Sequence, residues 1–260
     1  MKFNAPIDLS GKIAVVTGAR QGLGKIFAEA LASAGAEVFL MARNEAELEK
    51  AAAEISANTG AKIHWYPIDI LDEASVEAAA AHVKEKAGRL DILFNNAALG
   101  RGSTHLQDTS LEEWKLTIDT NLTGTFLCIK HFGRIMIAQK SGKVINMTSL
   151  AARAVFPTAC TGAYDCSKAA VGCLTRCMAG EWAQYNINVN SISPGFFLTD
   201  INKRFLEENP GFYETSTAGV PLNRWGNPEE LAPLALFLAS SASDYITGAD
   251  FNIDGGYTLW

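Results

Sequence analysis

Short apolar runs of strand length alternate with longer segments of helical period along the whole chain. We expect strands at residues 13–17, 38–41, 62–66, 92–94, 144–147, 188–192 and 251–253. Helices are expected between them at residues 22–34, 45–58, 73–86, 111–139, 164–185 and 228–240. Because parallel strands are joined by crossovers that are usually helical, this alternation predicts an α/β fold. The expected architecture is a doubly wound parallel sheet of about seven strands with helices on both faces.

No change of composition and no linker divides the chain. Its 260 residues, 48% of them hydrophobic, can form a sizeable core, so we expect a single domain over residues 1–260. Residues 196–222 contain scattered Gly and Pro and are expected to be irregular. Because ordinary connections are much shorter, this segment is predicted to be a mobile lid over the substrate.

The composition argues against several classes of partner. A net charge of −6 and a pI of about 5.3 disfavour nucleic acid and anionic membrane surfaces. The apolar stretch 231–239 is too short to span a bilayer, and the N-terminus lacks the apolar core of a signal peptide. The five cysteines are odd in number and the four histidines have no zinc spacing. We therefore expect reduced thiols, no metal site and a cytoplasmic protein.

A glycine-rich turn, TGARQGLG at residues 17–24, directly follows the first expected strand. Its glycines allow a tight turn and let backbone N–H groups approach a pyrophosphate at a helix N-terminus, where the helix dipole favours anions. The spacing is GxxxGxG, which in isolation is often only a flexible turn. Between the first strand and the first helix of a βαβ series, it predicts a Rossmann-type dinucleotide-binding fold.

The end of the second strand bears on the choice of cofactor. NAD-binding domains usually place an acidic residue there to hold the ribose 2′-hydroxyl, but this chain has Ala42 followed by Arg43. A guanidinium pairs well with a 2′-phosphate, and Arg20 adds a second positive charge. Alternatively, Arg43 stacks on adenine in an NAD enzyme, or is solvated. We favour NADP(H) over NAD(H).

Tyr164 and Lys168 lie four residues apart at the start of an expected helix. This spacing places the phenol and the ammonium on one helical face. A nearby cation stabilises phenolate, so we expect Lys168 to lower the pKa of Tyr164 and make it a proton donor to a carbonyl, or an acceptor from an alcohol. Most Tyr/Lys pairs at this spacing lie on a solvated helix surface. The pair indicates a catalytic role only in combination with the glycine turn.

With these motifs in place, the chain resembles the short-chain dehydrogenases/reductases of the single-domain type over nearly its whole length. Residues 17–24 match the TGxxxGxG turn, and 95–98 match NNAG with Ala98 replacing the glycine. Residues 194–199 match PGxxxT, and 164–168 match YxxxK. The resemblance implies contacts to the cofactor from Gly18, Arg20, Gln21, Gly22, Leu23, Gly24, Arg43, Asp69, Ile70, Asn95, Ala97, Tyr164, Lys168, Pro194, Gly195, Phe197 and Thr199.

The same resemblance implies a catalytic set of Asn121, Ser149, Tyr164 and Lys168. Tyr164 would exchange the proton at the substrate oxygen, and Ser149 would hydrogen-bond that oxygen. Lys168 would hold the nicotinamide ribose, and Asn121 would position a water that links Lys168 to solvent. One departure is that Ser149 and Tyr164 are 15 residues apart, about two more than is common in the family, which places extra residues within 156–162.

The substrate implied is a small carbonyl or alcohol compound, with the C-terminal segments resembling sugar, sugar-acid and polyol enzymes such as gluconate 5-dehydrogenase. Similar segments occur in 3-oxoacyl reductases, which is the alternative. A further alternative, which is not an enzyme, is a regulator on the same fold that binds NAD(P) without catalysing a reaction. Arg101, His105 and Arg153 follow strand ends on the active-site side and could bind a carboxylate, or be solvated loop charges.

Family resemblance also implies a homotetramer, built through the helices at 111–139 and 164–185. Their apolar content exceeds one core-facing stripe, which suggests burial on a second side. The side chains on which this expectation depends are Phe126, Leu127, Ile129, Val171, Leu174 and Trp182. Trp260 is a further candidate for a subunit contact.

Overall fold

The computed structural model describes residues 7–100, 105–155 and 161–259, and a seven-stranded sheet forms its centre. The strand order is β3-β2-β1-β4-β5-β6-β7, and all neighbouring strands are parallel. The strands are β1 (Ile13–Thr17), β2 (Glu37–Ala42), β3 (Ile63–Pro67), β4 (Ile92–Asn95), β5 (Gly142–Met147), β6 (Ile187–Pro194) and β7 (Asp250–Ile253). The predicted α/β class and the doubly wound parallel sheet are confirmed.

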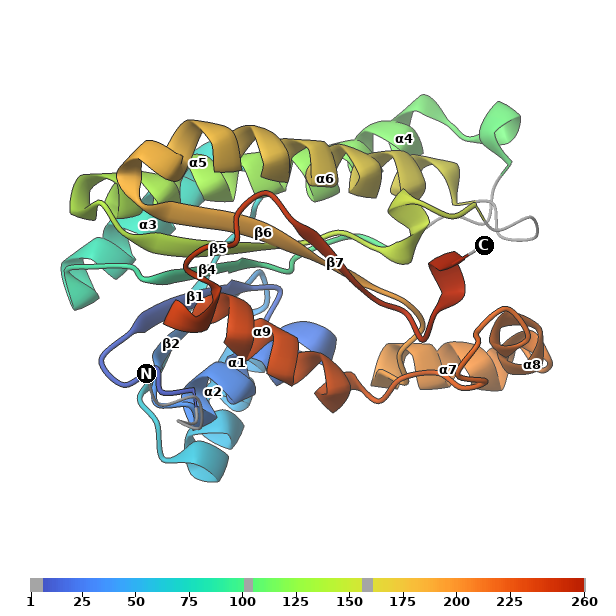
Figure 1. Cartoon of the computed structure of the whole chain (residues 1–260), viewed down its shortest axis with the longest axis horizontal. Helices are drawn as coiled ribbons and strands as arrows, with labels where there is room; N and C mark the ends of the chain where they lie inside the picture. Colours follow the sequence, from blue (N-terminus) through green and yellow to red (C-terminus); the bar gives the residue numbers. More distant parts are fainter. Residues whose placement is uncertain (1–6, 101–104, 156–160, 260) are drawn as a thin grey trace.

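Helices cover both faces of the sheet (Figure 1). On one face lie α1 (Gly22–Ser33), α2 (Glu45–Thr59) and α9 (Ala232–Ala239). On the other face lie α3 (Glu73–Ala87), α4 (Leu111–Ile118), α5 (Gly124–Gln139) and α6 (Gly162–Trp182). The starts of α2, α3 and α4 follow from their N-cap residues Asn44, Asp72 and Ser110, whose side chains each accept a backbone N–H of the first turn.

Two hydrophobic cores separate the sheet from its helical layers. Along β1, Ala14 and Val16 belong to the core under α1, α2 and α9, whereas Ile13 and Val15 belong to the core under α3, α5 and α6. Successive side chains of a strand point to opposite faces, and both faces of this strand are buried. For that reason the central strands are continuous apolar runs and do not alternate with polar residues.

The prediction that residues 196–222 are irregular is wrong. The segment contains helices α7 (Asp200–Glu208) and α8 (Phe212–Thr217), which lie together beyond the end of the sheet (Figure 1). Helix α7 begins where the Thr199 side chain accepts the N–H of Asn202. Its apolar residues Ile201 and Phe205 lie one turn apart and are 55% and 41% exposed, so the helix is amphipathic but buries little surface.

Aromatic side chains fasten α8 to the rest of the domain. The Phe212 ring meets Phe196 edge-on at 6.4 Å, and Phe196 stacks on Trp225 at 5.0 Å. The indole of Trp225 donates a hydrogen bond to the Ser216 hydroxyl at 2.9 Å. These long-range contacts, which no local pattern reveals, stabilise a short helix that would be unstable alone.

The expected helix over residues 111–139 is interrupted. A π-helical turn at Asp119–Thr123 separates α4 from α5 and contains Asn121. Such single turns widen the helix by one residue and commonly occur at functional sites. The interruption matters here because it sets the direction of the Asn121 side chain.

The apolar argument for a second buried side of these helices is largely wrong. Leu127, Ile129, Val171 and Trp182 are already buried within the single chain, and Leu174 packs against the same core. Phe126, at 43% exposed, is the remaining side chain of that set which faces outward. The predicted tetramer therefore stays a prediction, with a weaker basis than the sequence suggested.

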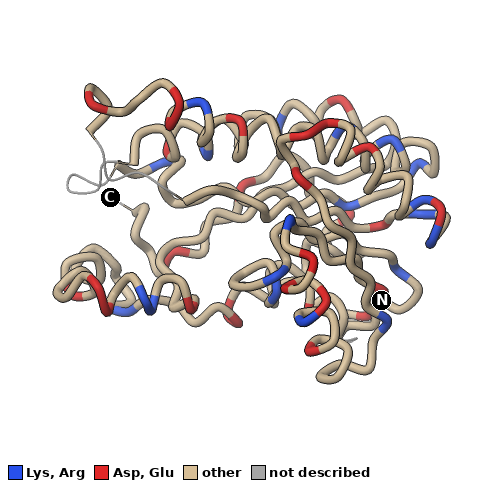
Figure 2. The backbone as a smooth tube through the Cα atoms, turned by 180° about the vertical axis from the view of Figure 1, so that it is seen from behind, with Lys and Arg blue, Asp and Glu red and all other residues tan. Residues whose placement is uncertain are grey.

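Positions of Lys and Arg alternate with positions of Asp and Glu along the backbone of both helical layers (Figure 2). Within residues 7–100, 105–155 and 161–259, no helix combines the length and apolarity needed to cross a membrane.

The sheet order places a topological switch next to β1. Strand β1 has β2 on one side and β4 on the other, so the chain leaves β1 in one direction and returns on the opposite side. In open parallel sheets, the loops at the carboxyl ends of the strands diverge at such a point and leave a crevice. The glycine turn after β1 and the loop after β4 meet there.

Candidate active site

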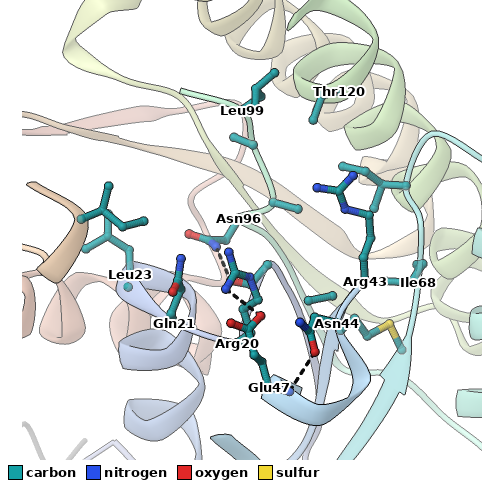
Figure 3. Close-up of a pocket in the computed structure, with 18 of the residues that line it drawn as sticks. Arg20, Gln21, Leu23, Arg43, Asn44, Glu47, Ile68, Asn96, Leu99 and Thr120 are labelled. Carbon is teal, nitrogen blue, oxygen red and sulfur yellow. Dashed lines mark hydrogen bonds and ion pairs between the residues drawn. The ribbon is translucent and has the colours of Figure 1, made fainter. Parts of the chain in front are cut away.

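A cavity of about 990 Å³ lies at this switch point (Figure 3). Its walls come from the glycine turn, the ends of β2 and β3, the loop after β4, the π-helical turn and the start of α7. The residues that line it are Gly18, Arg20, Gln21, Gly22, Leu23, Met41, Ala42, Arg43, Asn44, Glu47, Ile68, Asp69, Ile70, Leu71, Asn96, Ala97, Ala98, Leu99, Leu116, Thr120, Thr199, Ile201 and Asn202.

The glycine turn is built by close backbone contacts. Gly18 has φ of 67°, and its N–H donates to the Met41 carbonyl at 2.7 Å. A Cβ at Gly24 would lie 2.4 Å from the Gly18 carbonyl oxygen, so this position admits only glycine without a backbone shift. Gly24 does not line the cavity, and its role is to let α1 pack against the turn.

The N-terminus of α1 suits an anion. Its N-cap residue, Gln21, makes no side-chain hydrogen bond to the helix, and the first turn holds no acidic residue. The backbone N–H groups at the start of the helix therefore have no capping side chain, and they border the cavity at Gly22 and Leu23. With the positive end of the helix dipole, they fit the pyrophosphate of a dinucleotide.

Two arginines reach the end of the cavity formed by β2 (Figure 3). Arg43 is exposed, and among the described residues it forms no ion pair. Arg20 forms an ion pair with Glu47, Nη1 to Oε2 2.7 Å. Asn44 accepts the N–H of Glu47 at 3.1 Å and so fixes the first turn of α2 against the cavity.

Asp69 follows β3 and lines the cavity beside Ile68 and Ile70. Its carboxylate accepts the N–H of Leu71 at 3.0 Å, and its own N–H donates to the Ser75 hydroxyl at 3.0 Å. These two bonds hold the turn that presents the carboxylate to the cavity.

The loop after β4 is tied to β1 through Thr17. The Thr17 hydroxyl accepts the N–H groups of Asn96 at 3.1 Å and Ala97 at 3.0 Å. The Asn96 amide in turn donates to the Thr17 carbonyl at 3.1 Å. Sequence reasoning named Ala97 and not Asn96 as a contact, and the second asparagine of the NNAG match was the available signal.

Asn121 links the cavity wall to helix α6. Its amide Nδ2 donates to the Ser167 hydroxyl at 2.9 Å and to the Leu99 carbonyl at 3.1 Å, while its Oδ1 accepts the Leu99 N–H at 2.7 Å. Ser167 then donates to the Tyr164 carbonyl at 2.7 Å. Asn121 is 1% exposed, so each of these bonds is made away from solvent.

Ser149, Tyr164 and Lys168 come together where β5 ends and α6 begins. The Ser149 hydroxyl is close enough to the Tyr164 phenol to oppose the rise of its pKa, and it also accepts the Ala151 N–H at 3.2 Å. The Lys168 ammonium donates to the Met147 carbonyl at 2.8 Å and lies 5.6 Å from the centre of the Tyr164 ring. None of the three lines the 990 Å³ cavity, to which they are connected through Ser167 and Asn121.

The expectation that Lys168 lowers the pKa of Tyr164 is wrong for this structure. Burial raises the pKa of Tyr164, and the nearby Ser149 hydroxyl opposes that rise without cancelling it. Burial also lowers the pKa of Lys168 to about 8. The physical reason is that the ammonium is turned to the Met147 carbonyl, and desolvation affects both groups more strongly than their mutual attraction.

Besides Gly24, Tyr164 and Lys168, four other expected cofactor residues lie outside the cavity lining. Asn95 is 3% exposed and donates to the Asn146 side chain at 2.8 Å. Pro194 and Gly195 continue the pairing of β6 with β7, where the Gly195 N–H donates to a β7 carbonyl at 2.8 Å. Phe197 is 4% exposed and belongs to the hydrophobic core, so its ring does not face the cavity.

Six further lining residues were not predicted from the sequence. They lie in helices or at helix starts, and the hydrophobic pattern did not show that these positions face the cavity: Asn44, Glu47, Leu116, Thr120, Ile201 and Asn202. For Asn44 the signal was its helix-capping position. For Ile201 and Asn202 the signal was the capping residue Thr199 before an amphipathic segment, but α7 itself was not predicted.

Arg101, His105 and Arg153 were named as candidate substrate contacts. His105 precedes the short turn Leu106–Asp108 and does not line the cavity. Arg153 forms an ion pair with Asp250 at 3.1 Å and thereby ties the segment after β5 to β7. Arg101 and Trp260 lie outside the described residues. So do residues 156–160, which form most of the segment 156–162 where the two extra residues are expected.

Comparison with known proteins agrees with this geometry. The family model described as enoyl-(acyl carrier protein) reductase matches residues 18–258. Galactitol 2-dehydrogenase (L-tagatose-forming) of Cereibacter sphaeroides is 36% identical over 260 residues, which is 100% of both chains. NAD-dependent glycerol dehydrogenase of Listeria innocua is 38% identical and covers 99% of this chain and 98% of its own.

Among solved structures, a gluconate 5-dehydrogenase from Burkholderia cenocepacia in complex with NADP and tartrate superimposes with a TM-score of 0.92. It is 34% identical, and the match covers 98% of each chain. The fold and the cavity thus define an NAD(P)-dependent oxidoreductase that acts on CH–OH groups. The chain belongs to the short-chain dehydrogenase/reductase family.

Proposed function

We propose that the protein interconverts a secondary alcohol and a ketone on a sugar, sugar acid or polyol, with Tyr164 as acid and base and NADP(H) as the preferred cofactor. The observation that carries the proposal is the meeting of Ser149, Tyr164 and the buried Lys168 where β5 ends and α6 begins. It pairs a polarising hydroxyl with a proton-transfer group at the end of β5, close to a cavity that fits a dinucleotide.

The cofactor would be held by the chain's own cradle: the amides of Gly22 and Leu23 at the pyrophosphate, and Asp69 and Arg43 at the adenosine end. When bound, the nicotinamide supplies the redox chemistry by donating or accepting a hydride. The residues described below supply binding, orientation and proton transfer.

In ketone reduction, Tyr164 donates its proton to the substrate oxygen, and in alcohol oxidation it removes that proton. Ser149 donates a hydrogen bond to the same oxygen as negative charge develops there, a contribution of about 3 kcal/mol for a preorganised donor. Lys168, with a pKa lowered by burial to about 8, can give up and regain a proton near neutral pH. Asn121 holds the helix turn that carries Tyr164, through Ser167.

The proposed preference for NADP(H) rests on the end of β2. Ala42 offers no carboxylate to a ribose 2′-hydroxyl, and Arg43 borders the cavity without an ion pair among the described residues. A guanidinium in that state is free to bind a 2′-phosphate through two hydrogen bonds. The relatives point both ways, since one is named for NAD and one structure holds NADP.

The sugar or polyol substrate class is supported by the names of the relatives, which act on galactitol and glycerol or are named for gluconate. We also propose that α7 and α8 form the substrate lid, because Ile201 and Asn202 at the start of α7 already border the cavity. The proposed tetramer would place Phe126 of α5 in a subunit contact.

The experiment that tests the proposal is a kinetic survey with both cofactors. Galactitol, glycerol and gluconate would be offered with NADP⁺ and NAD⁺, and acetoacetyl thioester with NADPH and NADH, following absorbance of the reduced nicotinamide. We expect turnover on a hydroxyl-rich substrate and higher kcat/KM with NADP⁺. Turnover confined to the thioester would assign the 3-oxoacyl alternative, and binding of cofactor without turnover on any substrate would favour a regulator.

A further inference from the structure

We propose that Glu47 is a specificity-determining residue that restrains the preference for NADP(H) by neutralising Arg20 at the adenosine end of the cavity. The inference rests on the proposed placement of the cofactor's adenosine beside β2. It adds a residue of α2, 27 positions from Arg20 in the sequence, to the group that chooses between the two cofactors.

The geometry of the pair is well defined. Arg20 Nη1 lies 2.7 Å from Glu47 Oε2, and both side chains line the cavity (Figure 3). Glu47 is held in the first turn of α2 because its N–H donates to the Asn44 cap at 3.1 Å. The carboxylate is therefore anchored from its own backbone, while the longer Arg20 side chain reaches across to it from the glycine turn.

The charges around the cavity show what the pair does. Within the described part of the chain, the charged residues that line it are Arg20, Arg43, Glu47 and Asp69, which sum to zero. A 2′-phosphate brings about two negative charges at neutral pH and needs unpaired guanidinium groups. As the structure stands, Arg43 is available to it, but Arg20 is already engaged by a carboxylate that would repel the phosphate.

The same carboxylate favours the cofactor that lacks the phosphate. A ribose 2′-hydroxyl is a hydrogen-bond donor, and NAD-binding domains usually meet it with an acidic side chain at the end of β2. Ala42 occupies that position here, and Glu47, in the first turn of α2, is the next carboxylate along the chain that borders the cavity. Glu47 thus supplies an acceptor for NAD(H) and competes with the phosphate of NADP(H) for Arg20.

The test is a measurement of cofactor binding without substrate. Isothermal titration calorimetry of the full chain with NADPH and with NADH would compare the wild type, Glu47→Gln and Glu54→Gln. Glu54 is a matched control, because it lies on the same helix, pairs with Lys25 and does not line the cavity. The double variant R20Q/E47Q tests whether any gain passes through Arg20.

We expect Glu47→Gln to bind NADPH about tenfold more tightly and to bind NADH no better than the wild type does. The gain in NADPH affinity should shrink with added salt, since the interaction is electrostatic and partly exposed, and it should be lost in R20Q/E47Q. Glu54→Gln should resemble the wild type. If Glu47→Gln is poorly folded, as judged by circular dichroism, Glu47→Ala replaces it with the same expectation.

An unchanged ratio of the two affinities in the Glu47 variants would overturn the proposal, as would the same shift in Glu54→Gln. The ratio of the NADPH and NADH affinities in the wild type tests the proposed NADP(H) preference itself. A wild type that binds NADH more tightly than NADPH contradicts the proposed NADP(H) preference, while the shift caused by Glu47→Gln still decides whether this residue sets the ratio.

Discussion

The Lys168 ammonium is bound to the carbonyl of Met147, the last residue of β5, at 2.8 Å, and lies 5.6 Å from the centre of the Tyr164 ring. Lys168 and Tyr164 share one face of α6, but the lysine makes its hydrogen bond to the sheet and not to the phenol. The lysine next to the proton-transfer group Tyr164 is therefore held at the end of β5.

Burial of Lys168 predicts a pH dependence of stability. Its pKa falls from 10.5 to about 8 in the folded chain, so between these values the unfolded chain holds a proton that the folded chain has lost. When the unfolded state binds more protons, stability rises with pH. We expect the free energy of unfolding to rise from pH 8 towards 10.5 more steeply in the wild type than in Lys168→Met, measured by urea denaturation. Equal slopes would show that Lys168 keeps its ordinary pKa.

Removing the Ser149 hydroxyl should affect the chemistry and leave the fold intact. We expect Ser149→Ala to lower kcat by roughly 10²- to 10³-fold, the usual cost of losing a preorganised donor at a developing oxyanion. NADPH affinity and thermal stability should be close to those of the wild type. Ser56→Ala removes a hydroxyl from α2 that bonds Ala61, away from the site, and serves as the control with unchanged kcat. A Ser149→Ala variant that keeps the wild-type kcat and changes only KM would contradict the role assigned to Ser149.

The close approach of α1 to the glycine turn predicts the effect of one added methyl group. In Gly24→Ala the new Cβ would lie 2.4 Å from the Gly18 carbonyl oxygen, so the turn has to move. We expect weaker NADPH binding together with a lower melting temperature. In Gly180→Ala, on α6, the added Cβ meets no atom within 4 Å, and we expect about 0.5–1 kcal/mol of stabilisation with unchanged binding. Normal affinity in Gly24→Ala would mean that the turn does not cradle the cofactor.

The sheet and its seven strands could be predicted because both faces of the central strands are buried, which leaves continuous apolar runs such as Ile13–Thr17. The short helix α8 could not, because its packing depends on Phe196 and Trp225, which lie outside it in the sequence. Helix α7 does carry a local signal, the Thr199 cap followed by Ile201 and Phe205 one turn apart, which the sequence analysis did not use.

In the candidate site too, features set by local geometry could be predicted and features set by long-range contacts could not. Positions set by local geometry, such as Gly18 at the end of β1 and Asp69 after β3, could be placed from the sequence. The burial that raises the pKa of Tyr164 and the pairing of Arg20 with Glu47 arise only when distant segments meet. Sequence spacing alone could reveal neither of these effects.

We propose above that the Tyr164 phenol carries the proton in the reaction. The decisive measurement is the turnover and NADPH affinity of Tyr164→Phe on the substrate that the wild type uses best. We predict that turnover falls to near the detection limit while the dissociation constant for NADPH stays close to that of the wild type, because Phe keeps the ring and loses only the hydroxyl. A Tyr164→Phe variant that retains near-wild-type turnover would contradict the assignment of Tyr164 as the proton-transfer group.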